Sequence, residues 1–449
     1  MTTANPLIAE IRQHALPFSD LPKDLAPLIE MIGDARFVLI GEATHGTEEF
    51  YRIRAELSKV LIRDHGFAAV AIEGDWPDTF RANEYVRGDR HIIDAESALS
   101  GFKRFPSWMW RNGVTARFLD WLRDENGKRP APQRAGFYGL DLYSLNASIE
   151  AVITYLDRVD PPAADRARQH YGCFDHHNAD HPQDYGLRAV TGAARSCEDD
   201  VVRELAALQK RVADYSKHNS GTSPEAFFSA EQNARAVIGA EHYYRSMFSN
   251  RASSWNIRDR HMTSTLDAIA GHLSNARNER AKLIVWAHNS HIGDARATEM
   301  GTAGEVTLGQ LVREQHGEHD TRLIGFSTAR GTVTAASHWD GEPETKTILS
   351  PSRETYEGLF HACGLDSFAL LLRSNFALAP HLSLSRLQRA IGVLYLPETE
   401  RRSHYFFASL PQQFDALVHI DRTSALKPLD EIMLRSPVGD LAESYPTGL

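Results

Sequence analysis

Short runs of apolar residues recur along the chain and predict the strands of a buried sheet. The runs are nearly continuous in Val, Ile, Leu and Ala instead of alternating with polar residues. Such runs are typical of strands that are covered on both faces, and therefore of a parallel sheet. The seven runs are RFVLIGE (36–42), AAVAIEG (68–74), AGFYGLD (135–141), KLIVWAHN (282–289), RLIGFST (322–328), IGVLYLP (391–397) and DALVHID (415–421).

Segments of helical periodicity separate these runs. Residues 47–65 place their apolar side chains on one helical face, with Thr47 as the expected N-cap and Gly66 directly after the last turn. A strand, a helix and a second strand at this spacing predict a right-handed crossover. From residue 144 to 281 apolar residues recur at three and four positions, and the pattern predicts helices almost throughout.

The order of these elements defines the expected fold class. We expect an α/β protein with a mainly parallel sheet core flanked by helices, and a helical subdomain inserted between the third and fourth core strands. The expected boundaries are 1–143 for the first part of the α/β core, 144–281 for the helical insertion and 282–449 for the second part.

Charge and hydropathy narrow the class of partner. The chain has 49 basic and 59 acidic residues among 449, a formal net charge of -10. An acidic chain without a basic stripe is not expected to bind nucleic acid or an anionic membrane. No apolar run approaches the length of a membrane span, and the N-terminus lacks the pattern of a signal peptide. We therefore expect a cytoplasmic protein with a small-molecule partner.

The cysteines indicate no metal site. Cys173, Cys197 and Cys363 are odd in number and far apart, and no CxxC pair is present. We expect all three to be reduced and structural, which fits a cytoplasmic protein.

Polar residues stand where four of the predicted strands end. Each alone could be a solvated edge residue, a helix cap or a satisfied core residue. Because ligands bind beyond the carboxyl ends of parallel strands, and buried carboxylates need partners, the conjunction favours a site. The residues at these ends are Glu42, His45, Glu73, Asp141, His288 and His291.

The chemistry that remains is that of histidine and carboxylates. No GxSxG elbow, GxGxxG turn or GxxxxGK[ST] loop is present. His45 could act as a general base, oriented by a carboxylate, that deprotonates water for attack on an ester. Arg54, His288 or a backbone N–H could then stabilise the oxyanion.

A metal site made of the same side chains stays open as an alternative. Two histidines and two carboxylates can bind a divalent ion and activate its water, but no HExxH spacing supports this. A second cluster, His176, His177 and His181, lies in a polar segment, which we interpret as a solvated loop.

Several motifs, taken in order, resemble the erythromycin esterase family from about residue 30 to about residue 425. The motifs are LIGEATHGTEEFYRIR, AIEGDWPD, FPSWMWRN, GLDLYS, WNIRDRHM and VWAHNSHIGD. The resemblance implies an α/β core, a helical subdomain, a deep cleft and hydrolysis of a macrolactone ester by activated water without a metal. By position it implies that His45 is the base, and that the other functional positions of the family are Glu42, Glu73, Arg54 and His288.

Further residues in these motifs are candidates for substrate binding. Arg258 could be a positive clamp in the site, or it could form a structural ion pair with Asp259 or another acid. Aromatic side chains could line a cleft for a bulky ligand or pack in the core. The substrate-binding candidates are Arg258, Asp141, Trp108, Trp110, Tyr143 and His291.

Three functions follow from this site. The first is a hydrolase of the erythromycin esterase type that uses His-activated water, needs no cofactor and forms no covalent intermediate. The second is a metal-dependent hydrolase with His45, Glu73 and His288 as ligands. The third is a non-catalytic protein that binds a small molecule in the same cleft.

Overall fold

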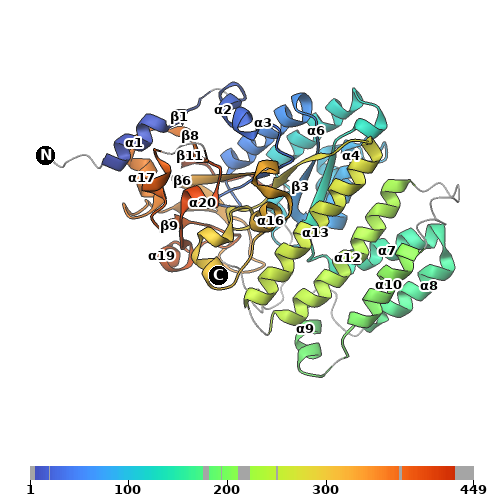
Figure 1. The fold of residues 1–449 in the computed structure, drawn as a ribbon. Helices are drawn as coiled ribbons and strands as arrows, with labels where there is room; N and C mark the ends of the chain where they lie inside the picture. Colours follow the sequence, from blue (N-terminus) through green and yellow to red (C-terminus); the bar gives the residue numbers. More distant parts are fainter. Residues whose placement is uncertain are drawn as a thin grey trace.

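A central sheet of mostly parallel strands organises the chain (Figure 1). The computed structural model describes residues 6–19, 21–174, 182–193, 195–210, 223–248, 251–373 and 377–429. Within them the strand order is β1-β8-β11-β6-β2-β5-β3-β4, with β7 on β6 and a separate hairpin of β9 and β10. The strands are β1 (Leu16–Pro17), β2 (Phe37–Ile40), β3 (Phe67–Asp75), β4 (Gly136–Asp141), β5 (Lys282–Trp286), β6 (Thr321–Ala335), β7 (Glu344–Ile348), β8 (Ser367–Leu371), β9 (Arg386–Arg389), β10 (Tyr405–Ala408) and β11 (Ala416–Thr423).

The expected mainly parallel α/β fold is confirmed. The strands from β11 to β4 in that order are parallel neighbours, whereas β1, β7 and β8 pair antiparallel. Six of the seven apolar runs form the parallel strands. The prediction for 391–397 is wrong, because this segment makes only isolated bridges, Thr44 with Ile391 and Ala336 with Leu394. Its apolar side chains are instead buried beside the end of β6.

Helices cover both faces of the sheet (Figure 1), because successive residues of a strand point to opposite faces. In β2, Val38 and Ile40 pack in one core, and Phe37 and Leu39 pack in the other. The first core is covered by α2 (Ala26–Ile32), α3 (Glu48–Asp64), α4 (Trp76–Val86), α5 (Ala95–Ala98) and α6 (Gly113–Gly127). The second is covered by α1 (Pro6–His14), α13 (Arg251–Arg277), α16 (Leu308–Asp320), α17 (Tyr356–Ala362), α18 (Ala379–Leu382) and α20 (Leu410–Gln413).

Between β4 and β5 the described chain is helical and contains a third core. Most of these helices lie to one side of the sheet in Figure 1, whereas α13 packs on the sheet through Met262 and Leu266. The helices of the third core are α7 (Leu145–Val159), α8 (Pro161–Tyr171), α9 (Pro182–Val190), α10 (Glu198–Lys210) and α12 (Pro224–Ser246). The remaining short helices are α14 (Asn289–Ile292), α15 (Glu299–Thr302) and α19 (Glu400–Ser403).

The expectation of three reduced cysteines is wrong for two of them. Cys173 and Cys197 form a disulfide, with their Cα atoms 5.9 Å apart, whereas Cys363 is free and buried. The packing of α8 against α10 brings the two residues together across 24 positions of sequence, which their spacing alone does not reveal. The disulfide removes the support that reduced cysteines gave to a cytoplasmic location.

The expected N-cap of α3 also differs in detail. Thr47 occupies the N-cap position, but its hydroxyl binds the Thr44 hydroxyl rather than the first turn. The free N–H of Glu48 instead donates to the carbonyl of Ser424, at 3.0 Å, in the segment after β11. The cap is therefore supplied by a distant part of the chain.

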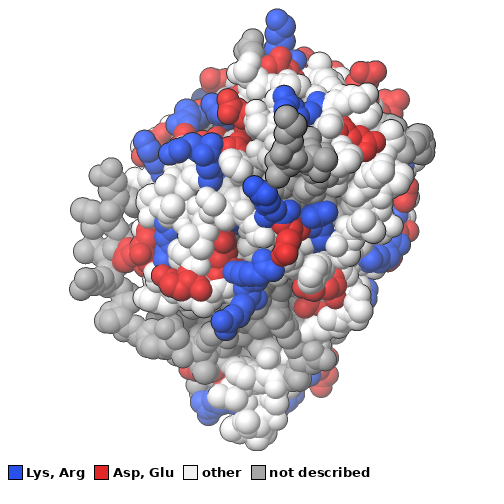
Figure 2. Space-filling view, turned by 90° about the vertical axis from the view of Figure 1, so that its left-hand side faces the viewer, with Lys and Arg blue, Asp and Glu red and all other residues white. Residues whose placement is uncertain are grey.

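The surface turned to the viewer in Figure 2 carries basic and acidic side chains intermingled, and neither sign forms a continuous patch among the residues described there. Within the described ranges, no helix has the length and hydropathy to cross a bilayer. Four neighbouring strands, β2, β5, β3 and β4, end at the same edge of the sheet, and there the polar residues of the sequence motifs gather.

Candidate active site

His45 lies in the turn between β2 and α3 with its ring fixed by Glu42. The imidazole Nδ1 is 2.8 Å from Glu42 Oε1, and both side chains are buried. Neighbouring segments hold this turn: the His45 N–H donates to Ile391 O at 3.3 Å, and the Leu426 N–H donates to Gly46 O at 2.8 Å. A Cβ at Gly46 would stand 1.8 Å from Thr334 O, so only glycine permits this approach of β6.

Arg54 lies behind Glu42 and not in the cavity. Its Nη2 atom is 2.8 Å from Glu42 Oε2, and the side chain is fully buried. The guanidinium stacks on Tyr51, 4.3 Å from the ring centroid. The sequence analysis offered Arg54 as an oxyanion donor, but the structure places it where it contacts Glu42 and reaches His45 only through that carboxylate.

Glu73, at the end of β3, connects three parts of the site. Its Oε2 accepts the backbone N–H of His288 at 2.8 Å, and its Oε1 is 2.8 Å from Arg258 Nη2 and 3.3 Å from His291 Nε2. Burial opposes ionisation of Glu73, but the positive charges of His291 and Arg258 outweigh it and hold its pKa well below the ordinary value.

Arg258, from α13, forms its main ion pair with Asp141 at the end of β4. Its Nε is 3.0 Å from Oδ1 and its Nη2 is 2.6 Å from Oδ2, a bidentate arrangement. Burial lowers the pKa of Arg258, but the charge of Asp141 outweighs this and the pKa lies well above its usual value. The alternative pairing with Asp259 is not formed, because Asp259 binds His291.

His291 is held from both sides. Its Nδ1 is 3.0 Å from each carboxylate oxygen of Asp259, and Trp255 stacks on the ring at 4.2 Å. Burial lowers the pKa of His291, but the charges of Asp259 and then Glu73 outweigh it and raise the pKa to about 9. His291 is therefore a buried cation behind Arg258, and Asp259 is a site residue that the sequence analysis considered only as an ion-pair partner of its neighbour.

His288 faces His45, with the ring centroids 4.8 Å apart. Its Nδ1 accepts the Ser290 N–H at 3.2 Å and lies 2.7 Å from the Ser290 hydroxyl. Burial, and then the neighbouring His45, hold the pKa of His288 well below its ordinary value, so the ring is neutral. Because Nδ1 accepts, the proton of the neutral ring belongs on Nε2.

A small cavity of about 50 Å³ opens at this edge of the sheet. The expected residues on its wall are His45, Glu73, Asp141, Tyr143, Trp110 and Arg258. The expected residues that do not line it are Glu42, Arg54, His288, His291 and Trp108. Trp108 packs in the core beside the sheet, so it follows the packing interpretation rather than the cleft interpretation.

Three charged residues on the cavity wall were missed by the sequence analysis. They are Asp75, Asp78 and Arg104. Asp75 Oδ2 is 3.2 Å from Arg104 Nη2, and the Arg104 guanidinium lies 4.7 Å from the ring centroid of Tyr143. The two aspartates belong to the motif AIEGDWPD, so position in a motif was the available signal.

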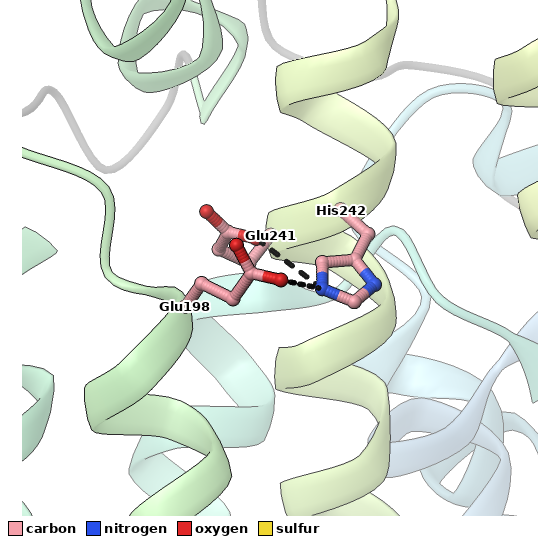
Figure 3. Close-up of side chains that lie close together, drawn as sticks. All are labelled: Glu198, Glu241 and His242. Carbon is pink, nitrogen blue, oxygen red and sulfur yellow. Dashed lines mark hydrogen bonds and ion pairs between the residues drawn. The ribbon is translucent and has the colours of Figure 1, made fainter.

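The metal alternative receives little support from the donor atoms. Both oxygens of Glu73 already accept N–H groups, beside two positive charges, which makes this carboxylate a poor cation ligand. Among the described residues, the side chains close enough to share an ion are Glu198, Glu241 and His242, far along the chain from the cavity residues (Figure 3). Arg245 pairs with both carboxylates at 2.8 and 3.1 Å and offsets part of their charge. His176, His177 and His181 lie outside the described residues.

The sheet edge and its side chains define an α/β enzyme with a histidine and carboxylate site. The family model described as "Erythromycin esterase" matches residues 62–423. Erythromycin esterase type II of Escherichia coli is 23% identical over 441 residues, covering 92% of this chain and 97% of that protein. Erythromycin esterase type I of Escherichia coli is 23% identical over 376 residues, covering 77% and 84%.

Solved structures share the fold. A Bacillus cereus protein has a TM-score of 0.75 at 22% identity, covering 96% of this chain and 100% of its own. A mutant of erythromycin esterase EreC in its open conformation has a TM-score of 0.66 at 18% identity, covering 92% and 96%. The chain belongs to the erythromycin esterase family, and by that membership it is a hydrolase of the esterase type.

Proposed function

We propose that this enzyme hydrolyses a carboxylic ester, a macrolactone or a related ester, with a water activated by His45. The observation that carries the proposal is the position of His45 on the cavity wall. Glu42 holds its Nδ1 at 2.8 Å, and so Nε2 is the atom left to accept a proton from water. The names of the curated relatives support a macrolide as the substrate.

Each neighbour has a role in this scheme. Glu42 orients the imidazole and stabilises the imidazolium that forms, and Arg54 holds Glu42 in place from behind. The guanidinium of Arg258, on the cavity wall, is the donor for the oxyanion that develops on the carbonyl oxygen. Glu73 holds Arg258 in place and also binds the His288 backbone N–H.

The scheme uses no covalent intermediate. Ser290 is the hydroxyl beside a histidine, but it does not line the cavity, and both its N–H and its hydroxyl lie at the Nδ1 of His288. It therefore fixes a tautomer and is not positioned to attack a substrate in the cavity.

The test is a panel of macrolides with detection by mass spectrometry of a product heavier by one water. We expect wild-type turnover, and His45→Asn is expected to lower it by roughly 10²- to 10⁴-fold. The control is His65→Asn, an exposed histidine after α3, which should keep wild-type turnover. Ligand binding without turnover in the wild type would support a binding protein instead. Turnover of other esters but of no macrolide would exclude macrolides as substrates and leave the esterase activity standing.

A further inference from the structure

A second ionisable group faces the cavity from the side of α4. Asp78, in the first turn of α4, lines the same cavity of about 50 Å³ as His45. Gly101 packs against it so closely that a Cβ there would lie 3.2 Å from Asp78 Oδ1. Within the described residues Asp78 forms no hydrogen bond and no ion pair, so neither a cap nor a salt bridge accounts for its position.

Asp75 gives this wall a second carboxylate. Its Oδ2 contacts Arg104, and a hydrogen bond from the Tyr143 backbone also favours its charged form. Asp75 lines the cavity as well. Asp75 stands at the N-cap of α4, but its side chain does not cap the helix. The side chains of both acidic residues at the start of α4 therefore line the cavity and do not cap the helix.

The environment of Asp78 favours a proton on it. Burial, and then the charge of Asp75, raise the pKa of Asp78 to about 7, while Arg104 and Lys103 oppose this shift. A carboxylic acid that keeps its proton near neutral pH can donate it, as an efficient general acid must.

We propose that Asp78 is the general acid that protonates the leaving alcohol of the ester. The inference rests on the proposed hydrolysis and deepens it by assigning the second proton transfer. Because His45 and Asp78 line the same small cavity, an ester bound with its carbonyl carbon at His45 can turn its alkoxy oxygen toward Asp78. In this arrangement His45 acts as the base and Asp78 as the acid.

Every proton is accounted for over one catalytic cycle. Water gives a proton to His45 as its oxygen bonds to the carbonyl carbon. The bond between that carbon and the alkoxy oxygen then breaks, and the oxygen takes the proton of Asp78. The acid and alcohol leave, and the proton on His45 returns to the Asp78 carboxylate through solvent, so ester and water are the only reactants consumed.

The test compares two leaving groups on one acyl group. The probes are the ethyl and 4-nitrophenyl esters of an acid whose esters the wild-type enzyme cleaves. An alkoxide needs a proton to leave and nitrophenolate does not, so Asp78→Asn should lower kcat/KM for the ethyl ester about 100-fold and for the nitrophenyl ester less than about fivefold. Asp78→Glu, which keeps the carboxyl group, should recover part of the loss for the ethyl ester.

The controls distinguish the loss of a general acid from a folding defect. They also distinguish failure of this inference from failure of the proposed function. Glu84→Gln changes an exposed carboxylate of the same helix and should leave both rates unchanged. An equal loss with both esters in Asp78→Asn would overturn the inference and return the second proton transfer to His45. Absence of cleavage of any ester by the wild type would overturn the proposed function, and this inference with it.

Discussion

The carboxylate of Glu73 accepts the backbone N–H of His288 at 2.8 Å, which joins the ends of two neighbouring strands, β3 and β5. The same carboxylate binds Arg258, which extends the connection to Asp141 after β4. Residues that are more than 200 positions apart in the sequence therefore form one hydrogen-bonded unit. Three predictions concern the groups of the active site, and a fourth concerns the disulfide of the third core.

Arg54 is expected to act through Glu42 as a positioning residue. Arg54→Met leaves the Glu42 carboxylate buried without its cation, which should lower the free energy of unfolding by about 3–5 kcal/mol. It should also lower kcat more than it raises KM, because Arg54 does not reach the cavity. Urea unfolding and steady-state kinetics measure the two effects.

The matched control for Arg54 lies on the same helix. Arg63→Met removes an exposed arginine near the end of α3 and should change stability by no more than about 0.5 kcal/mol. Arg54→Lys keeps the charge and should restore part of kcat. A rise in KM alone would instead place Arg54 in substrate binding.

The charge of His291 should make the free energy of unfolding depend on pH in the alkaline range. Its pKa is about 9 in the folded protein and near 6.5 when unfolded, so its stabilisation is complete below about pH 6.5 and is lost as pH rises through 9. The free energy of unfolding should fall by roughly 3 kcal/mol across this window. Urea titrations at several pH values measure the slope.

The fall of the free energy of unfolding with rising pH should depend on His291 itself. His291→Gln should flatten it, and His65→Gln, which changes an exposed histidine, should leave it as in the wild type. Equal stability of the wild type at pH 6.5 and pH 9.5 would contradict the proposed imidazolium between Asp259 and Glu73.

Removal of metal is expected to leave hydrolysis unchanged. Both oxygens of Glu73 accept N–H groups, which makes this carboxylate a poor ligand for a cation. The measurement is turnover after dialysis against a chelator, together with elemental analysis of the purified protein. Loss of activity that returns with a stoichiometric divalent ion would support the metal-dependent alternative.

The disulfide between Cys173 and Cys197 is expected to stabilise the helices of the third core. Closing a loop with a sequence separation of 24 should contribute about 3 kcal/mol. Cys197→Ser, or treatment with dithiothreitol, should lower the free energy of unfolding by a similar amount. Cys363→Ala is the control, because the reductant should still destabilise this variant. A count of three free thiols in unfolded, unreduced protein would contradict the bond.

The sequence predicted much of the sheet because apolar runs report burial on both faces, and this information is local. It also placed Glu73, Asp141 and the histidines at strand ends, since parallel strands bring their ends to one edge. It did not select Asp141 over Asp259 as the partner of Arg258. That choice depends on how the 27 residues of α13 pack across the sheet, which no local pattern encodes.

Long-range packing also explains the other differences between the sequence predictions and the structure. The segment 391–397 has the composition of a strand, but it makes only single bridges, because it passes between the turn at Thr44 and the end of β6. Arg54 was expected at the reaction centre because it is the last residue of the first motif of the family resemblance. Only the packing of α3 shows that its side chain points behind Glu42.

The segment after β11 has a consequence for protein synthesis. The Ser424 carbonyl caps α3, and the Leu426 N–H closes the turn that holds His45. These contacts join the turn after β2 to residues that follow β11. A nascent polypeptide released before this segment therefore lacks the contacts that fix its base, so ribosome-bound or truncated chains that have completed the sheet should still be inactive.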